Sequence, residues 1–134
     1  MDDRTGVIID TCPDPEAGLY ITRRDESVLH VTIPNDCMAV QIGEFVQIIT
    51  GGTLVATPHC VRGARSSNIS RVANPYFIDT APSFPLSMPA GSSREKVLSS
   101  STNSKVSSLS KRWEKDGTTF GEFLDKTFKV YYAE

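Results

Sequence analysis

Residues 28–57 read VLHVTIPNDCMAVQIGEFVQIITGGTLVAT, and this stretch decides the expected fold. Residues 28–33 alternate and are rich in β-branched side chains, which favours a half-buried strand. Residues 45–49 are the strongest strand candidate. The TGG sequence at 50–52 then favours a hairpin turn, because glycine adopts positive φ angles without steric cost. Residues 54–57 would resume the sheet.

Further short β-type runs lie on both sides of this stretch. We expect them at residues 7–9, 19–22, 38–42 and 74–78. About seven short strands at this spacing are typical of a sandwich, barrel or jelly roll. A parallel α/β sheet is disfavoured, because no helix-length segment separates the strands. The sequence therefore predicts a mainly β protein.

The composition changes after residue 80, which divides the chain into three predicted parts. Residues 1–80 form the β core. Residues 81–110 are rich first in proline and then in serine, and we expect a loop or linker there. A weak helix over residues 94–113 is the alternative. Residues 111–134 contain the best helix, which we expect to pack on the β core.

The C-terminal helix is predicted from two local signals. Thr119 and Glu122 form a capping box, in which each side chain satisfies a free backbone N–H group of the first turn. Apolar side chains then recur at helical spacing, which favours core packing over a cofactor site. These apolar residues are Phe120, Phe123, Leu124, Phe128 and Tyr131.

Charge and cysteine content exclude several classes of protein. The 134 residues carry 14 basic and 16 acidic side chains, a net charge of −2, which disfavours a nucleic-acid partner. No apolar run reaches the roughly 20 residues that span a bilayer, and the N-terminus does not resemble a signal peptide, so no membrane partner is expected. The three cysteines lack CxxC spacing. We expect packed, reduced thiols and a cytoplasmic location.

The two histidines differ in their expected roles. His59 lies at the end of a predicted strand, where a rigid backbone suits a metal ligand or a base, although a lone histidine is more often structural. His30 lies mid-strand and should face solvent if Leu29 and Val31 face inward. Cys60 follows His59 directly, and neighbours on a strand face opposite sides. The His59–Cys60 pair is therefore no natural chelate.

Several short motifs occur in an order and spacing that match a known family. They are TIPNDCMAVQIGE at 32–44, QIITGG at 47–52, ATPHCV at 56–61, RVANPYFID at 71–79 and TFGEF at 119–123. With these motifs the chain resembles the isopenicillin N synthase-like proteins, a branch of the iron(II)/2-oxoglutarate-dependent oxygenases. The resemblance touches most of the chain apart from the Ser-rich stretch.

The resemblance implies an incomplete double-stranded β-helix, or jelly roll, with a C-terminal helix. In this family iron(II) is held by two histidines and one carboxylate, with open positions for 2-oxoglutarate and oxygen. His59 would match the distal histidine, and Asp3, or alternatively Asp2, the metal carboxylate. Arg71 would match the arginine that grips the far carboxylate of 2-oxoglutarate, since its planar fork suits a bidentate pair. Without the resemblance, an ordinary surface ion pair is the expectation for Arg71.

The chain also departs from the family pattern. The proximal histidine should stand at position 1, where the chain has Met1, or just before the chain begins if Asp2 is the carboxylate. The first strand of the β-helix is missing, and Ala73 replaces a serine that commonly helps to bind the cosubstrate. We therefore expect the C-terminal part, or a degenerate relative, of an oxygenase that acts on a small molecule. We assign no catalytic residue and expect the isolated chain to be inactive.

Two alternatives remain open at the level of sequence. One is a non-catalytic jelly-roll module that forms a homo-oligomer through an unpaired sheet edge. The other is a protein that kept Arg71 and binds a small dicarboxylate without redox chemistry.

Overall fold

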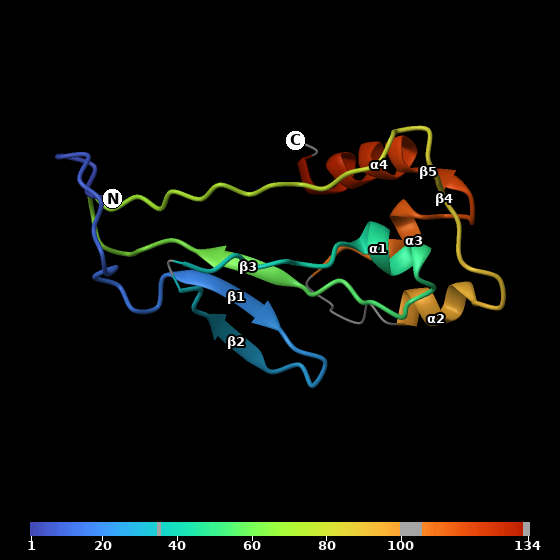
Figure 1. Ribbon diagram of the computed structural model, residues 1–134, viewed down its shortest axis with the longest axis horizontal. Helices are drawn as coiled ribbons and strands as arrows, with labels where there is room; N and C mark the ends of the chain where they lie inside the picture. The colour runs from blue at the N-terminus through green and yellow to red at the C-terminus, as the bar shows by residue number, and fades with distance from the viewer. Residues whose placement is uncertain (35, 100–105, 133–134) are drawn as a thin grey trace. The chain divides into compact units, whose positions relative to one another are not determined.

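The computed structural model describes residues 1–34, 36–99 and 106–132. The chain divides into two compact units, and each unit draws on two separate stretches of sequence. The N-terminal unit comprises Met1–Ala39 and Pro58–Phe77. The C-terminal unit comprises Val40–Thr57 and Ile78–Glu134. The described residues combine antiparallel strands with helices, so the protein is of mixed α and β class and the mainly β prediction is corrected (Figure 1).

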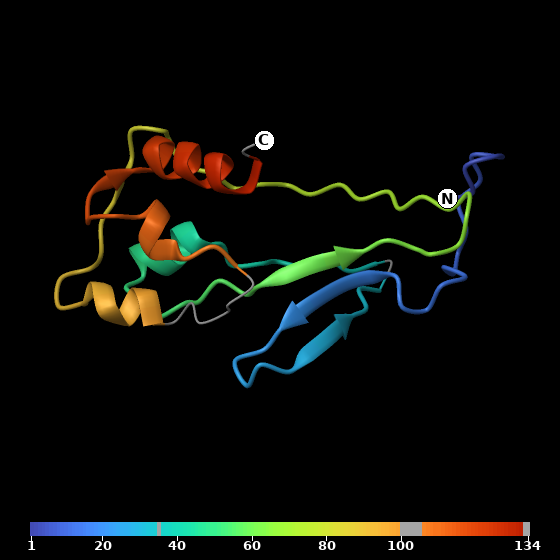
Figure 2. The same ribbon diagram turned by 180° about the vertical axis from the view of Figure 1, so that it is seen from behind.

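The N-terminal unit is built on a three-stranded antiparallel sheet in the order β2-β1-β3. Strand β1 is Gly18–Thr22, β2 is Val28–Val31 and β3 is His59–Arg62. Figures 1 and 2 show β1 in the middle, joined to β2 by a hairpin and flanked on its other side by β3. The strands predicted at 19–22 and 28–33 are confirmed, the second one ending at Val31.

The start of the chain is held by backbone hydrogen bonds to residues 68–70. Asp2 and Ile69 form an isolated antiparallel bridge. The N–H of Ser70 donates to the carbonyl of Met1 over 3.0 Å, and the N–H of Asp3 donates to the carbonyl of Asn68 over 2.9 Å. The first residues therefore lie against the segment that follows β3.

The C-terminal unit contains four helices and a second, two-stranded sheet among its described residues. The helices are α1 (Glu44–Ile49), α2 (Arg94–Ser99), α3 (Leu109–Arg112) and α4 (Phe120–Tyr132). The short strands β4 (Pro85–Leu86) and β5 (Thr118–Thr119) pair antiparallel. Part of the predicted 81–110 loop is thus regular, and residues 100–105 of it lie outside the described residues.

Every buried apolar side chain among the described residues belongs to the C-terminal unit. These side chains are Ile48, Leu86, Val97, Leu109, Trp113, Phe120 and Phe123. Each large apolar side chain that is buried contributes about 1.5–3 kcal/mol to folding. The C-terminal unit therefore has a hydrophobic core of its own, whereas no described side chain of the N-terminal unit is buried.

The strand predicted at residues 45–49 is wrong, because this run forms helix α1. Phe45, Ile48 and Ile49 also follow the i, i+3, i+4 spacing of a helix, so the short apolar run is compatible with both structures. Ile48 is fully buried, and Phe45 and Ile49 pack against the core around it. Tertiary packing of this apolar stripe decides in favour of the helix.

The two glycines after α1 adopt the expected conformation in a different kind of turn. Gly51 and Gly52 have φ angles of 60° and 75°. The N–H of Gly51 donates to the carbonyl of Ile48, and the N–H of Gly52 donates to the carbonyl of Gln47. Gly51 and Gly52 therefore close the C-terminal end of a helix rather than a β-hairpin.

The remaining predicted strands, at residues 7–9, 38–42, 54–57 and 74–78, have no strand partner among the described residues. At residues 54–57 the reason is visible, because the N–H of Ala56 donates to Oε1 of Gln47 over 2.8 Å. The side chain of Gln47 thus accepts a backbone N–H that would otherwise be available for pairing with a neighbouring strand. The other runs are mostly exposed and are not paired with a strand among the described residues. A β-type sequence pattern forms a strand only where packing and a pairing partner support it.

Helix α4 confirms the predicted C-terminal helix and its capping box. The N–H of Thr119 donates to Oε2 of Glu122 over 2.9 Å, and the N–H of Glu122 donates to Oγ1 of Thr119 over 3.3 Å. The backbone N–H of Thr119 holds the pKa of Glu122 below its usual value. The apolar stripe is buried only over its first turn, since Phe128 and Tyr131 are about half exposed.

Candidate functional site

His59 is the first residue of β3 and lies on the apolar face of the N-terminal sheet. Directly opposed residues of antiparallel strands project to the same face. Ile21 is opposite both Leu29 and His59, and Leu19 is opposite both Val31 and Val61. His59 therefore shares a face with five aliphatic side chains, of which Val61 is 49% exposed. Apart from His59, the described strand residues of this face are aliphatic, and Leu19, Ile21, Leu29 and Val31 are partly buried.

The opposite face of the sheet carries His30 and Cys60. Both residues lie directly opposite Tyr20, His30 on β2 and Cys60 on β3. The rings of His30 and Tyr20 are stacked, with their centroids 4.5 Å apart. A Cβ atom at Gly18 would lie 2.5 Å from Nε2 of His30, so this close approach requires glycine. The predicted outward orientation of His30 relative to Leu29 is confirmed, as is the separation of Cys60 from His59. The cysteines Cys12, Cys37 and Cys60 are free and exposed, so the expectation of packed thiols is wrong.

Asp3 lies apart from His59 within the N-terminal unit. The backbone N–H of Asp3 donates a hydrogen bond to the carbonyl of Asn68, which follows β3 in the sequence. His59 is the first residue of β3, and the length of this strand, roughly 10 Å, separates His59 from the segment that follows it. Figure 1 shows the N-terminal segment beyond the carboxyl end of β3. Among the described residues no group of three or more His, Cys, Asp or Glu side chains is placed to hold a metal ion. In this arrangement Asp3 and His59 do not fit a shared iron ion.

Asp2, the alternative carboxylate, is already engaged in a local turn. Its Oδ1 accepts the N–H of Arg4 at 2.9 Å and that of Thr5 at 3.3 Å. The hydrogen bond from the Arg4 backbone is the main reason that the pKa of Asp2 lies below its usual value. The carboxylate of Asp2 therefore serves the turn at the chain start.

Arg71 lies next to the anchored N-terminus and is exposed. Its neighbour Ser70 exchanges two hydrogen bonds with Met1, which fixes the backbone at this point. The Arg71 guanidinium makes no ion pair or hydrogen bond with any residue that the structure describes. The predicted surface ion pair is thus absent from the described part of the chain, and the guanidinium is open to a carboxylate ligand.

A shallow surface depression of about 340 Å³ lies elsewhere on the N-terminal unit. Its lining includes Cys12, Asp14, Gly18 and His30. Asp14 is held by the backbone N–H of Arg65 at 2.9 Å, which lowers the pKa of its carboxyl group. The depression does not include Asp3, His59 or Arg71, so it is not the site that the sequence predicts.

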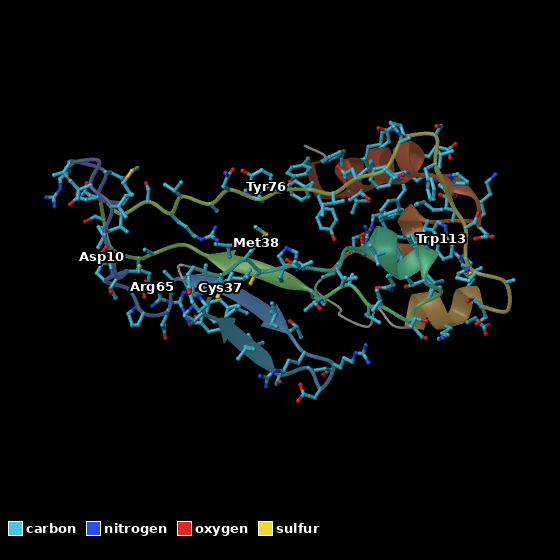
Figure 3. All side chains as sticks on the ribbon, in the orientation of Figure 1. Asp10, Cys37, Met38, Arg65, Tyr76 and Trp113 are labelled. Carbon is cyan, nitrogen blue, oxygen red and sulfur yellow. The ribbon has the colours of Figure 1, made fainter. Side chains whose placement is uncertain are left out.

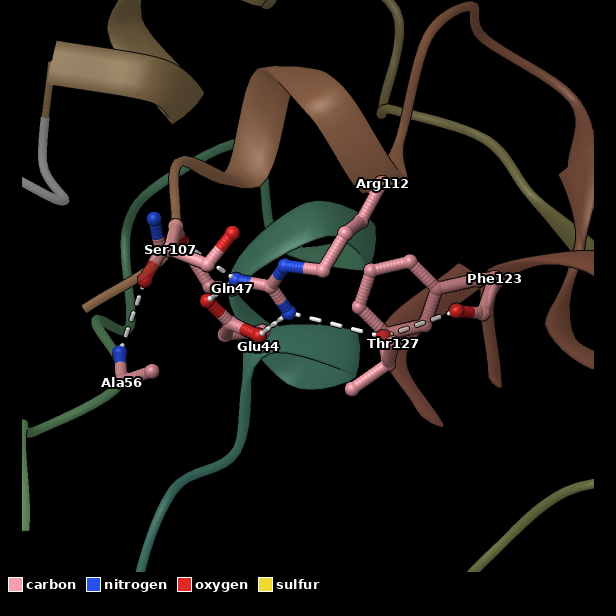
Figure 4. Close-up of polar contacts among 7 residues, drawn as sticks. All are labelled: Glu44, Gln47, Ala56, Ser107, Arg112, Phe123 and Thr127. Carbon is pink, nitrogen blue, oxygen red and sulfur yellow. Dashed lines mark hydrogen bonds and ion pairs between the residues drawn. The ribbon is translucent and has the colours of Figure 1, made fainter. Parts of the chain in front are cut away.

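The C-terminal unit contains a buried ion pair that the sequence analysis did not predict (Figure 4). Arg112 is fully buried, and both of its terminal nitrogens donate to the carboxylate of Glu44. The distance from Nη2 of Arg112 to Oε1 of Glu44 is 2.6 Å. Its guanidinium also donates to the carbonyl of Ser107 over 2.8 Å and lies 5.7 Å from the Phe123 ring centroid. Burial opposes the charge of Arg112, but the hydrogen bonds to Glu44 raise the pKa of Arg112 above its usual value.

Gln47 lies beside this ion pair on helix α1 and is itself fully buried. Its Nε2 donates to the carbonyl of Val97 over 2.8 Å, and its Oε1 accepts the N–H of Ala56 at the same distance. The polar side chains of α1 therefore connect three distant stretches of the C-terminal unit. Their role is structural, because each one is occupied by groups of the protein itself.

Comparisons with protein families, curated proteins and solved structures find no match for this chain. Among the described residues no helix has both the length and the apolar character required to cross a membrane.

Proposed function

We propose that this chain is the C-terminal part, or a degenerate relative, of an iron(II)/2-oxoglutarate-dependent oxygenase that acts on a small molecule. The proposed fold is an incomplete double-stranded β-helix with a C-terminal helix. The order and spacing of the five motifs support the family assignment. The observation that carries the proposal is the placement of His59 on the apolar, partly buried face of an antiparallel sheet.

An apolar sheet face without fully buried side chains is expected where a covering layer is incomplete. Two-layer β proteins bury the aliphatic residues of one sheet against a second sheet about 10 Å away. Here Leu19, Ile21, Leu29 and Val31 are only partly buried, and the N-terminal unit has no buried side chain among its described residues. In the proposed oxygenase fold, a further β-layer would cover this face.

The residues proposed for the site differ in how well they fit their roles. Arg71 has an open guanidinium that suits the distal carboxylate of 2-oxoglutarate as a bidentate pair. His59 offers an imidazole on a regular strand. Asp3 does not lie near His59, and the proximal histidine has no counterpart. The isolated chain is therefore proposed to bind the dicarboxylate without turning it over.

Incubation of the purified chain with iron(II), ascorbate and 2-oxoglutarate is expected to produce no succinate, because one ligand is missing and another is displaced. Succinate is measured by mass spectrometry, with an active oxygenase as the positive control. Turnover that depends on His59 would contradict the expected inactivity. The size of the endogenous protein then separates the two forms of the proposal. A product larger than 14.7 kDa with a histidine upstream of Asp3 identifies a fragment, and a product that starts at Met1 identifies a degenerate relative.

2-Oxoglutarate is expected to raise the melting temperature of the chain, and Arg71→Ala is expected to abolish this shift. A ligand present at a hundredfold excess over its Kd stabilises the native state by about 2.7 kcal/mol. The measurement is thermal unfolding followed by circular dichroism, over a series of 2-oxoglutarate concentrations. Arg24→Ala, which removes another exposed cation of the same unit, is the matched control. An equal shift in wild type and Arg71→Ala would exclude Arg71 from the binding site.

A second candidate function is supported by the same sheet. We propose as the alternative a non-catalytic module that self-associates, because both outer strands of the sheet, β2 and β3, have an edge without a strand partner among the described residues. Open edges and uncovered apolar faces favour association. The mass of the chain in solution, measured by light scattering, tests this candidate independently of any iron or 2-oxoglutarate chemistry.

A further inference from the structure

Residues 71–77 form an extended segment without a sheet. None of their backbone groups is hydrogen-bonded to a described residue. Nδ2 of Asn74 donates to the hydroxyl of Tyr76 over 3.1 Å, and this contact between positions i and i+2 places the two side chains on one side, as in a strand. Val72, Tyr76 and Phe77 are 75%, 82% and 83% exposed. Figure 3 shows the Tyr76 side chain on this long extended trace.

The edge strand β2 offers the complementary set of unpaired groups. The N–H of Arg23 donates to the carbonyl of Ser27, which identifies this pair as hydrogen-bonded. Hydrogen-bonded and non-hydrogen-bonded pairs alternate along antiparallel strands. Leu29 and Val31 therefore bond to β1, whereas Val28 and His30 direct their N–H and C=O groups away from the sheet.

The β2 edge also lacks the usual protection against strand addition. Edge strands are commonly protected by charged residues or prolines. The sequence of β2 is VLHV, with neither, and Val28 is 64% exposed. Strand β3 ends instead in Arg62, whose guanidinium pairs with Glu16 at 2.5 Å. Of the two outer strands, β2 therefore has the edge that is better suited to pair with an additional strand.

Pro75 determines which side of the extended segment can pair. Proline has no N–H group, so within a sheet it must face away from the neighbouring strand. Alternate residues share a side, which leaves Val72, Asn74 and Tyr76 with their N–H groups toward the partner strand. The segment can thus form a continuous ladder on one side only.

We propose that residues 71–77 of one chain add as a strand to the β2 edge of a second copy of the same chain. This inference rests on the self-association candidate and specifies its contact. One chain carries both an unpaired strand and an unprotected edge, so two copies can satisfy each other reciprocally and close a two-fold dimer. The segment brings two exposed aromatic side chains, and packing buries on the order of 150–250 Å² of each such side chain.

Proline substitutions test the assigned pairing in the full-length chain. Val72→Pro removes an N–H from the pairing side of the segment, and Val28→Pro removes an N–H from the open edge of β2. Each variant is expected to raise the dimer dissociation constant at least tenfold, as measured by sedimentation equilibrium. The N–H of Val72 is bonded to no described residue, and the ladder alternation directs the N–H of Val28 away from β1, so neither group is used by the sheet of the single chain.

Matched controls separate the ladder from other effects of substitution. Ala73→Pro places proline on the same outer side as Pro75, and Val72→Ala removes the valine side chain but keeps the N–H. Both controls are expected to remain dimeric. Fluorescence of Trp113, which lies in the core of the C-terminal unit, reports that this unit stays folded, and far-UV circular dichroism reports on the sheet.

Each outcome of this experiment has a defined meaning. A dimer that survives both Val72→Pro and Val28→Pro overturns the assigned contact but leaves self-association intact. A wild-type chain that is monomeric at all concentrations overturns both the contact and the self-association candidate. Neither result affects the oxygenase proposal, which the 2-oxoglutarate and chain-size measurements test separately.

Discussion

Replacement of Glu44 with alanine is expected to lower the free energy of unfolding of the C-terminal unit by about 3–5 kcal/mol. Glu44 is the carboxylate partner of Arg112, whose side chain is 0% exposed. Removal of one partner from a buried ion pair leaves the other charge without compensation in a poorly solvated place. Urea denaturation followed by Trp113 fluorescence measures the loss. The emission is a direct reporter because Trp113 is the only tryptophan and is fully buried.

A surface ion pair of the same unit is the control for this substitution. Glu114 pairs with Lys126 at 2.9 Å, but their side chains are 63% and 36% exposed. Glu114→Ala is expected to change stability by at most about 1 kcal/mol, because water already screens such a pair. Equal effects of Glu44→Ala and Glu114→Ala would show that the Arg112 charge is solvated in the folded protein.

Replacement of Trp113 with alanine is expected to cost the C-terminal unit about 3–5 kcal/mol, the range for a large aromatic residue in a core. The indole Nε1 donates to the carbonyl of Leu86 over 3.2 Å, so the substitution also removes one of the two hydrogen bonds that this carbonyl accepts, the other coming from the N–H of Gly117. The guanidinium of Arg94 lies 5.5 Å from the ring centroid and loses that contact. Urea denaturation is followed here by circular dichroism, because the variant lacks tryptophan.

Two further variants separate the contributions at Trp113. Trp113→Phe keeps much of the packing but removes the indole N–H, and an intermediate loss of stability is expected. Phe128→Ala removes a 55% exposed aromatic side chain from α4 and should change stability by less than about 1 kcal/mol. A loss at Phe128 as large as that at Trp113 would mean that the core extends beyond the buried cluster.

The sequence predicted those features of the fold that depend on neighbours in the chain. The capping box of Thr119 and Glu122 uses groups three residues apart, and α4 begins where that box indicates. Strands β1 and β2 lie within the runs predicted at 19–22 and 28–33, although the sequence analysis did not predict that the two runs pair with each other. In the candidate site, the opposite orientations of His59 and Cys60 follow from the two-residue period of any strand.

Tertiary structure decided those features that depend on distant partners. The run at 45–49 fits a strand and a helix equally well by spacing, and packing of Ile48 in the core selects the helix. Asp3 and His59 are in the right order for a metal site, but the N–H of Asp3 is hydrogen-bonded to Asn68, in the segment that follows β3, whereas His59 is the first residue of β3. Sequence order alone does not specify such a separation.

The sequence by itself thus determined local hydrogen bonding and side-chain periodicity, because both act over a few residues. Only the tertiary structure revealed that Arg112 pairs with Glu44, 68 positions away, and that all described buried side chains gather in one unit. The physical reason is that burial and ion pairing depend on which surfaces meet in space. For the N-terminal sheet, the same principle leaves the aliphatic side chains of one face only partly buried, and the outer edge of β2 has no strand partner among the described residues.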